Sequence, residues 1–118
     1  MAHTITSETL QKKVQFIKET SKSVAKVQKN IRNIEYRIYQ NRECEDWKYE
    51  YLVINYKGGA RTVRNCSGNS CSAIFEEIAK YLCSGYYSEE KDLANLERDP
   101  AHWELLAYIP DREEREDI

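Results

Sequence analysis

The chain has 118 residues, 41% of them hydrophobic and 32% charged, with a formal net charge of −2. This size suits one domain with a modest core, so we expect a single domain over residues 1–110. Residues 111–118 form a charged tail that we expect to be disordered when free. No apolar run approaches the roughly 18 residues that span a bilayer, which excludes a membrane-spanning protein. The first residues lack the apolar stretch of an export signal, so we expect a cytoplasmic protein.

The net charge conceals a gradient along the chain. Residues 1–34 carry seven Lys and Arg against two Glu, residues 35–84 are balanced, and residues 85–118 carry four basic against eleven acidic residues. Such asymmetry can indicate a nucleic-acid surface at the basic end, a basic partner at the acidic end, or two ends that attract each other. It can also reflect ordinary solvated helix faces, and the sequence leaves these alternatives open.

The first predicted element is a long amphipathic helix over residues 7–32. This stretch has no Gly or Pro, and apolar residues recur at spacings of three, four or seven. These residues are Leu10, Val14, Ile17, Val24 and Ile31. The narrow stripe could pair with a second copy of the chain, giving a homodimer, but packing on its own sheet is favoured.

Three strands are predicted next, over residues 34–39, 47–56 and 60–66, from their two-residue alternation and their content of aromatic and β-branched residues. Gly58 and Gly59 predict a two-residue hairpin turn, which would place Tyr56 opposite Arg61 and Ile54 opposite Val63. That register assigns one face to the core and leaves the other outside. The predicted core face holds Leu52, Ile54, Tyr56 and Val63, and the outer face holds Tyr51, Val53, Thr62 and Arg64.

Two or three shorter helices complete the prediction. Ser72 is the expected N-cap of the first, with Gly85 at its end, and Ser88 is the expected N-cap of a short acidic helix that ends before Asp99. Residues 102–109 could be a helix or an edge strand, and helix is preferred because Pro100 suits a first helical position. The expected fold is therefore α+β, with the order α-β-β-β-α-α and a three-stranded antiparallel sheet.

Metal, cofactor and catalytic chemistry have little support. The chain has four cysteines, which we expect to be free thiols: Cys44, Cys66, Cys71 and Cys83. No CxxC spacing is present, and only His3 and His102 could add nitrogen ligands, so no metal site is predicted. The Gly58-Gly59 pair lacks the pattern of a phosphate loop. Neither histidine stands in a nucleophile motif, so we expect a protein that binds and does not catalyse.

One expectation is direct binding of nucleic acid through basic residues of the first helix and the sheet. The candidates are Lys12, Lys18, Lys22, Lys26, Lys29, Arg61 and Arg64. Residues 7–84 also resemble the double-stranded-RNA-binding domain in the order helix, three strands, helix. That family begins its second helix with a basic run, whereas residues 69–74 read NSCSAI here, so the resemblance implies the fold more than the RNA contact.

A second resemblance covers residues 51–97. The strand, glycine-containing turn, strand, Ser-rich loop, amphipathic helix and acidic run resemble small phage type II-A anti-CRISPR proteins. This resemblance implies an inhibitor that mimics DNA at the PAM-reading site of Cas9. It implies that Glu89, Glu90, Asp92 and Glu97 meet the partner's Arg and Lys. We expect the same surface to include the neighbouring residues Tyr86, Tyr87 and Asp99.

Aromatic residues are concentrated on the predicted sheet. They are Tyr36, Tyr39, Trp47, Tyr49, Tyr51 and Tyr56. Such residues are common in recognition surfaces because they cover area while keeping a polar tip. Packing between neighbouring strands would explain them equally well.

Overall fold

The computed structural model describes residues 8–83 and 88–108, with the side chains of residues 9, 81–83 and 107–108 left out. It contains, in chain order, α1 (Glu8–Val27), β1 (Ile31–Asn41), β2 (Lys48–Tyr56), β3 (Arg61–Asn65), α2 (Cys71–Cys83), α3 (Glu90–Glu97) and β4 (Trp103–Tyr108). The strands form one antiparallel sheet in the order β3-β2-β1-β4. The expected α+β class is therefore confirmed. Within the described ranges, no helix is long and apolar enough to cross a membrane.

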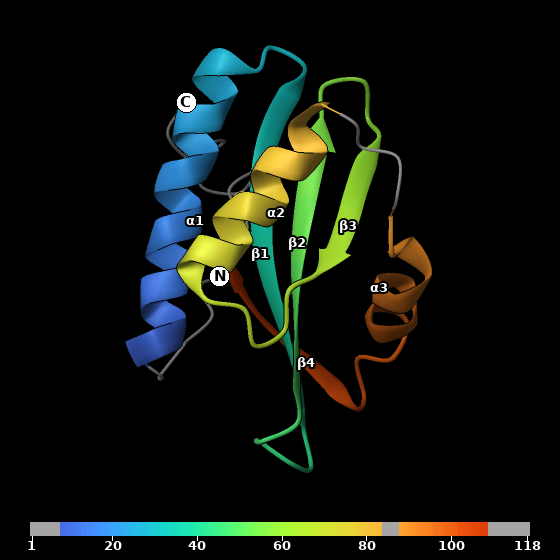
Figure 1. The fold of residues 1–118 in the computed structure, drawn as a ribbon. Helices are drawn as coiled ribbons and strands as arrows, with labels where there is room; N and C mark the ends of the chain where they lie inside the picture. Colours follow the sequence, from blue (N-terminus) through green and yellow to red (C-terminus); the bar gives the residue numbers. More distant parts are fainter. Residues whose placement is uncertain (1–7, 84–87, 109–118) are drawn as a thin grey trace, which may run out of the picture.

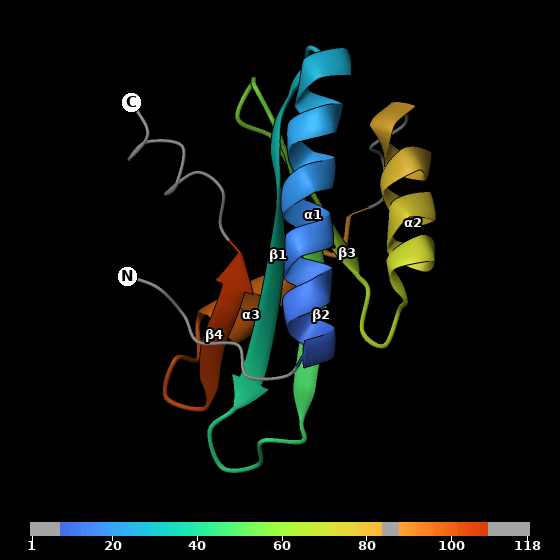
Figure 2. The same cartoon turned by 90° about the vertical axis from the view of Figure 1, so that its left-hand side faces the viewer.

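The sheet separates two layers of helices. α1 and α2 lie on one face, and α3 lies on the other (Figures 1 and 2). The larger core forms under α1 and α2, where Ile17 of α1 and Ile78 of α2 are buried against Ile34 and Leu52 of the sheet. Leu10, Val14 and Val24 also pack against this core. The predicted packing of the apolar stripe on the chain's own sheet is thus confirmed, with Ile17 fully buried and Leu10, Val14 and Val24 partly buried, and the homodimer considered from the sequence stays a prediction.

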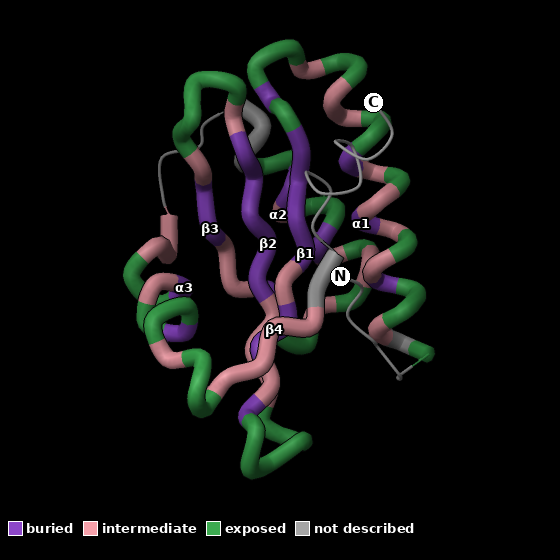
Figure 3. The backbone as a smooth tube through the Cα atoms, turned by 180° about the vertical axis from the view of Figure 1, so that it is seen from behind, coloured by how far each residue is buried: buried purple, intermediate pink, exposed green. Residues whose placement is uncertain are grey.

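A second, smaller core lies on the opposite face, where the sequence predicted an outer surface. Tyr51, Val53 and Val63 are buried there against Leu93 and Leu96 of α3. Figure 3 shows this face, with buried segments along β1, β2 and β3 and with α3 beside β3. Both faces of the sheet are therefore covered over part of their area, and the strand tyrosines at this end serve in packing.

The predicted hairpin register is wrong by one residue. Asn55 lies opposite Arg61 and Val53 opposite Val63, whereas the prediction paired Ile54 with Val63. Tyr56 N–H donates to the Ala60 carbonyl at 2.9 Å, so the loop holds three residues. The reason is that Gly59 alone of the glycine pair has positive φ, at 97°, which suits a three-residue loop with one left-handed residue. The shift moves Val63 from the larger core to the smaller one.

Residues 103–108 form a strand, so the preference for a helix there was wrong. One helical turn does follow Asp99, whose carbonyl accepts from the backbone N–H of Trp103 at 3.1 Å, but the chain then extends along β1. Alternate side chains serve opposite faces: Leu106 packs on the larger core, and Trp103 and Leu105 pack on the smaller one. A two-residue alternation of this kind needs a strand, and β4 covers an edge of β1 that would otherwise be open.

Three helix boundaries also differ from the prediction: the N-cap position of α3 is Glu89, not Ser88, and the other two are the end of α1 and the start of α2. α1 ends at Val27 because the chain turns at residues 28–30 and Ile31 opens β1, fully buried. α2 begins at Cys71, two residues earlier than predicted, since Ser70 Oγ, not Ser72, accepts from the Ala73 N–H at 3.3 Å. Gly85 and the tail at residues 111–118 lie outside the described residues.

Candidate functional site

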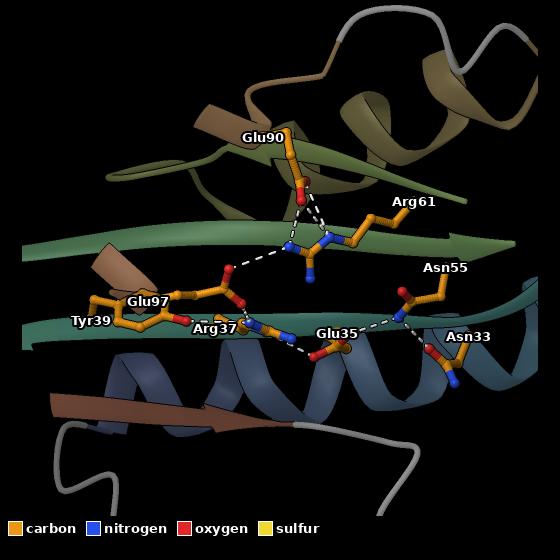
Figure 4. Close-up of polar contacts among 8 residues, drawn as sticks. All are labelled: Asn33, Glu35, Arg37, Tyr39, Asn55, Arg61, Glu90 and Glu97. Atoms are coloured by element: carbon orange, nitrogen blue, oxygen red, sulfur yellow. Dashed lines mark hydrogen bonds and ion pairs between the residues drawn. The ribbon is translucent and has the colours of Figure 1, made fainter. Parts of the chain in front are cut away.

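The acidic residues of α3 face the sheet and pair with its arginines. The Glu90 carboxylate accepts three hydrogen bonds from Arg61: from Nε to Oε1 at 2.9 Å and to Oε2 at 3.1 Å, and from Nη2 to Oε1 at 2.5 Å. Glu97 accepts from Arg37 Nη1 at 2.8 Å and lies 3.4 Å from Arg61 Nη2. Figure 4 shows the two arginines converging on these two carboxylates. Two of the predicted partner-binding residues are thus neutralised within the chain.

Glu89 lies at the edge of β3, and its carboxylate also has partners within the chain. Its Oε1 accepts from the Asn65 N–H at 2.8 Å and lies 3.3 Å from Arg64 Nη1. Arg64 in turn donates from Nε to Glu77 Oε1 of α2 at 2.7 Å. Arg61 and Arg64, predicted as nucleic-acid contacts, are therefore both held by carboxylates of the same chain.

The remaining residues of the predicted acidic surface have different surroundings. Asp92 of α3 is exposed. Asp99 Oδ1 accepts a hydrogen bond from the His102 ring at 2.8 Å, and this hydrogen bond, with the charge of Asp99, raises the pKa of the exposed imidazole. Tyr86 and Tyr87 lie outside the described residues. The structure therefore does not gather the predicted acidic set into one outward surface.

A buried polar network continues from the arginines along the same face. Arg37 Nε donates to Glu35 at 2.8 Å, and Asn55 Nδ2 donates to both Glu35 at 2.7 Å and Asn33 at 2.8 Å (Figure 4). Burial alone would lower the pKa of Arg37, but the hydrogen bond and charge of Glu35 raise it. Each buried polar group gains a partner in this way, so the network explains how charged residues are tolerated on a covered sheet.

Most lysines of α1, by contrast, point to solvent. The exposed lysines of α1 are Lys12, Lys22 and Lys26, and Lys29 in the following turn is exposed as well. No partner is found for these four among the described residues. Lys18 is half-buried and does have an interaction. Five of the predicted nucleic-acid lysines are therefore placed on one helix and the turn that follows it, and four of them are accessible.

Lys13 is the exception on α1, because it turns inward. Its Nζ lies 3.0 Å from Glu50 Oε1, and the same carboxylate accepts a hydrogen bond from the Tyr36 hydroxyl. Burial and Glu50 raise the pKa of the Tyr36 phenol far above its ordinary value, and burial followed by Glu50 raises that of the Cys66 thiol. Neither group is therefore activated as a nucleophile near neutral pH, and the cluster ties α1 to β2.

The structure brings together a second acidic region that the sequence analysis treated only as a polar connection. The loop between β1 and β2 places Glu43, Glu45 and Asp46 at one end of the molecule, all three exposed. The Asn41 carboxamide holds the start of this loop by accepting from the Glu43 and Cys44 N–H groups at 2.9 and 3.1 Å. Three carboxylates in four residues was the signal available in the sequence.

Aromatic rings border these carboxylates. The Trp103 ring lies 5.2 Å from Trp47 and 5.3 Å from Tyr49, centroid to centroid, and Trp47 remains 52% exposed. Arg42 fixes the loop to the turn before β4, donating from its backbone N–H to the His102 carbonyl and from Nε to the Pro100 carbonyl, both at 2.8 Å. We call this region, residues 43–47 with Tyr49 and Trp103, the aromatic-acidic tip.

Comparisons with known proteins add no assignment, since no family model, curated protein or solved structure matches this chain. Among the described residues, no group of three or more His, Cys, Asp or Glu is arranged to hold a metal ion. The candidate sites are therefore two surfaces argued from their own residues: the aromatic-acidic tip and the exposed lysines of α1.

Proposed function

We propose that this protein is a non-catalytic inhibitor that binds the nucleic-acid-handling surface of another protein, and that the aromatic-acidic tip makes the contact. The observation that carries the proposal is the placement of Glu43, Glu45 and Asp46, exposed and together, beside an exposed tryptophan. Surfaces that read DNA are rich in Arg and Lys, so clustered carboxylates complement them and steer association.

The neighbouring aromatic rings favour a binding surface here over a solvent-exposed loop without a binding role. Tryptophan and tyrosine are enriched among residues that dominate binding energy, because they bury a large area with little loss of side-chain freedom. Arginine also stacks on aromatic faces, so Trp47 would favour the same basic partner as the carboxylates. The tip thus replaces α3 as the proposed acidic surface, since Glu89, Glu90 and Glu97 are already paired within the chain.

The resemblance to type II-A anti-CRISPR proteins makes Cas9 the first partner to test. The assay is inhibition of Cas9 cleavage, with binding to the Cas9–guide complex measured directly. The triple variant Glu43→Gln/Glu45→Gln/Asp46→Asn should bind at least tenfold more weakly, a change of about 1.4 kcal/mol. The matched control removes three exposed carboxylates elsewhere, in Glu8→Gln/Glu19→Gln/Glu76→Gln, and should bind normally.

An equal loss of affinity in the two triple variants would show that only net charge matters. Full binding by the tip variant would exclude the tip as the contact surface. Failure of the unaltered protein to bind Cas9 would exclude Cas9 as the partner. Capture of other DNA-handling proteins, tested with the same two variants, would then decide whether the tip serves a different one.

A second candidate function is direct binding of nucleic acid through α1. The supporting observation is that Lys22, Lys26 and Lys29 are exposed and without partners among the described residues. Each phosphate contact makes affinity fall with salt, so binding of a duplex should weaken steeply between about 50 and 200 mM salt. The variant Lys22→Gln/Lys26→Gln/Lys29→Gln should reduce that salt dependence. Absence of any mobility shift at low salt would eliminate this candidate.

A further inference from the structure

On the sheet face beneath α3, two arginines form an anion-binding site that carboxylates of α3 occupy. Arg37 comes from β1 and Arg61 from β3, yet their guanidinium groups meet at the Glu97 carboxylate, 2.8 and 3.4 Å away. Arg61 also holds Glu90 in two-point contact. Both carboxylates belong to α3 and reach the sheet from outside it (Figure 4). The paired arginines thus bind two oxyanions from one short helix.

Aromatic rings lie beside these arginines, as on surfaces that bind single-stranded nucleic acid, and Arg37 also keeps the sheet carboxylate Glu35 as a partner. Tyr39 shares the face with Arg37 and accepts its hydrogen bond at 3.2 Å, and Tyr51 lies opposite Arg37 on β2. Both tyrosines are buried in the small core under α3. Proteins that bind single strands combine arginines for the phosphates with aromatic rings on which bases stack. This sheet face holds both groups side by side.

We propose that this face is a binding site for single-stranded nucleic acid and that α3 occupies it as an internal substitute. In this arrangement Glu90 and Glu97 stand where two phosphates would stand. Binding would then exchange one set of charge-assisted hydrogen bonds for another, since carboxylate and phosphate both match the guanidinium fork. The proposed site adjoins the aromatic-acidic tip, whose Tyr49 and Trp103 pack against the same small core, and it is separate from the lysines of α1.

The attachment of α3 is compatible with displacement. Its described apolar contribution consists of two leucines, Leu93 and Leu96, at the small core. The segment before it binds the edge of β3, where Glu89 N–H donates to the Val63 carbonyl at 2.7 Å and Ser88 Oγ accepts from the Val63 N–H at 2.9 Å. These bonds can hold one end of the helix at the sheet while the carboxylates leave the arginines.

The test weakens the internal substitute without changing the sheet. The variant Glu90→Gln/Glu97→Gln removes two charges from α3, and the control Glu8→Gln/Glu19→Gln removes two exposed charges from α1, so both have the same net charge. The probe is a fluorescent single-stranded DNA of mixed sequence at low salt, read by anisotropy. We expect the α3 variant to bind about tenfold more tightly than the control. Adding Arg37→Gln and Arg61→Gln should abolish the gain.

Equal affinities in the α3 variant and its control would overturn the proposal, as would a gain that survives loss of both arginines. The unaltered protein supplies a measurement that does not depend on variants folding. In NMR titration with excess oligonucleotide, the Nε–H signals of Arg37 and Arg61 should shift together with the backbone amides of α3. Shifts confined to Lys22, Lys26 and Lys29 would assign nucleic acid to α1 instead and would also overturn it.

Discussion

α1 and α3 carry opposite charge, but their charged side chains have different surroundings. Lys12, Lys22 and Lys26 on α1 project into solvent, whereas Glu90 and Glu97 on α3 reach arginines of the sheet. The exposed residues of α3 outside these ion pairs are Lys91, Asp92 and Asn95, whose charges balance. A count of charges by segment therefore predicted the exposed charge of α1 correctly and that of α3 incorrectly.

The cause of the difference is the surface on which each helix lies. α1 covers an apolar face of the sheet, so its charged residues gather on the opposite side of the helix, as in most amphipathic helices. α3 covers a face that carries arginines beside a small apolar core, and its acidic residues find partners there. Four experiments test how far this contrast extends.

The largest effect is expected at the apolar anchor of α3. Leu93 is fully buried, so Leu93→Ala should lower the free energy of unfolding by about 3 kcal/mol, from lost burial and the cavity left behind. Val27 at the end of α1 is 75% exposed, and Val27→Ala should change it by less than about 0.5 kcal/mol. Urea denaturation measures both. A small effect of Leu93→Ala would mean that ion pairs, not leucines, hold α3.

A smaller loss is expected at the one lysine of α1 that turns inward. Lys13→Met keeps the aliphatic stem but leaves the Glu50 carboxylate without its cation, which should cost about 2 kcal/mol. Lys12→Met, next to it but exposed, is the matched control and should stay within about 0.5 kcal/mol. Equal effects in the two variants would contradict the buried pairing.

The acidic residues of α3 should also affect the tyrosine beneath them. Burial, then the charges of Asp92 and Glu89, raise the pKa of Tyr51 to about 12, while in the unfolded chain it ionises near 10. Above about pH 10 the unfolded state therefore binds fewer protons, and stability falls as pH rises towards 12. Stability measured from pH 8 to 11 should fall less steeply in Tyr51→Phe. An unchanged slope would show that Tyr51 does not contribute.

The smallest effect is expected for the Arg61–Glu90 ion pair itself. Both side chains are partly exposed, at 25% and 46%, so a double-mutant cycle with Arg61→Gln and Glu90→Gln should give a coupling near 1 kcal/mol or less. Lys22→Gln, at a residue without a described partner, is the reference for an unpaired charge and should have almost no effect on stability. A coupling of several kcal/mol would mean that the pair is far less solvated than its exposure indicates.

Several elements were predictable because their signals are local. The heptad-like spacing of Leu10, Val14 and Ile17 predicted α1 and its buried side, and alternation predicted β1 and β2. β4 was missed because Pro100 favoured a helix start, while the deciding partner, the edge of β1, lies some sixty residues earlier in the chain. The tip was missed for a related reason: residues 43–47 show the acidic run and its own tryptophan, but the second tryptophan, Trp103, comes from β4.

The sequence by itself determined the fold class, the inward side of α1 and the absence of a recognisable catalytic motif, since all three depend on residue types and short spacings. Tertiary structure alone decided the hairpin register, the second core and which charges remain available. Those features depend on contacts between distant residues: 29 positions separate Arg61 from Glu90, and 60 separate Arg37 from Glu97. Periodicity shows where a side chain points along its own element, but an ion pair depends on what another element places opposite it.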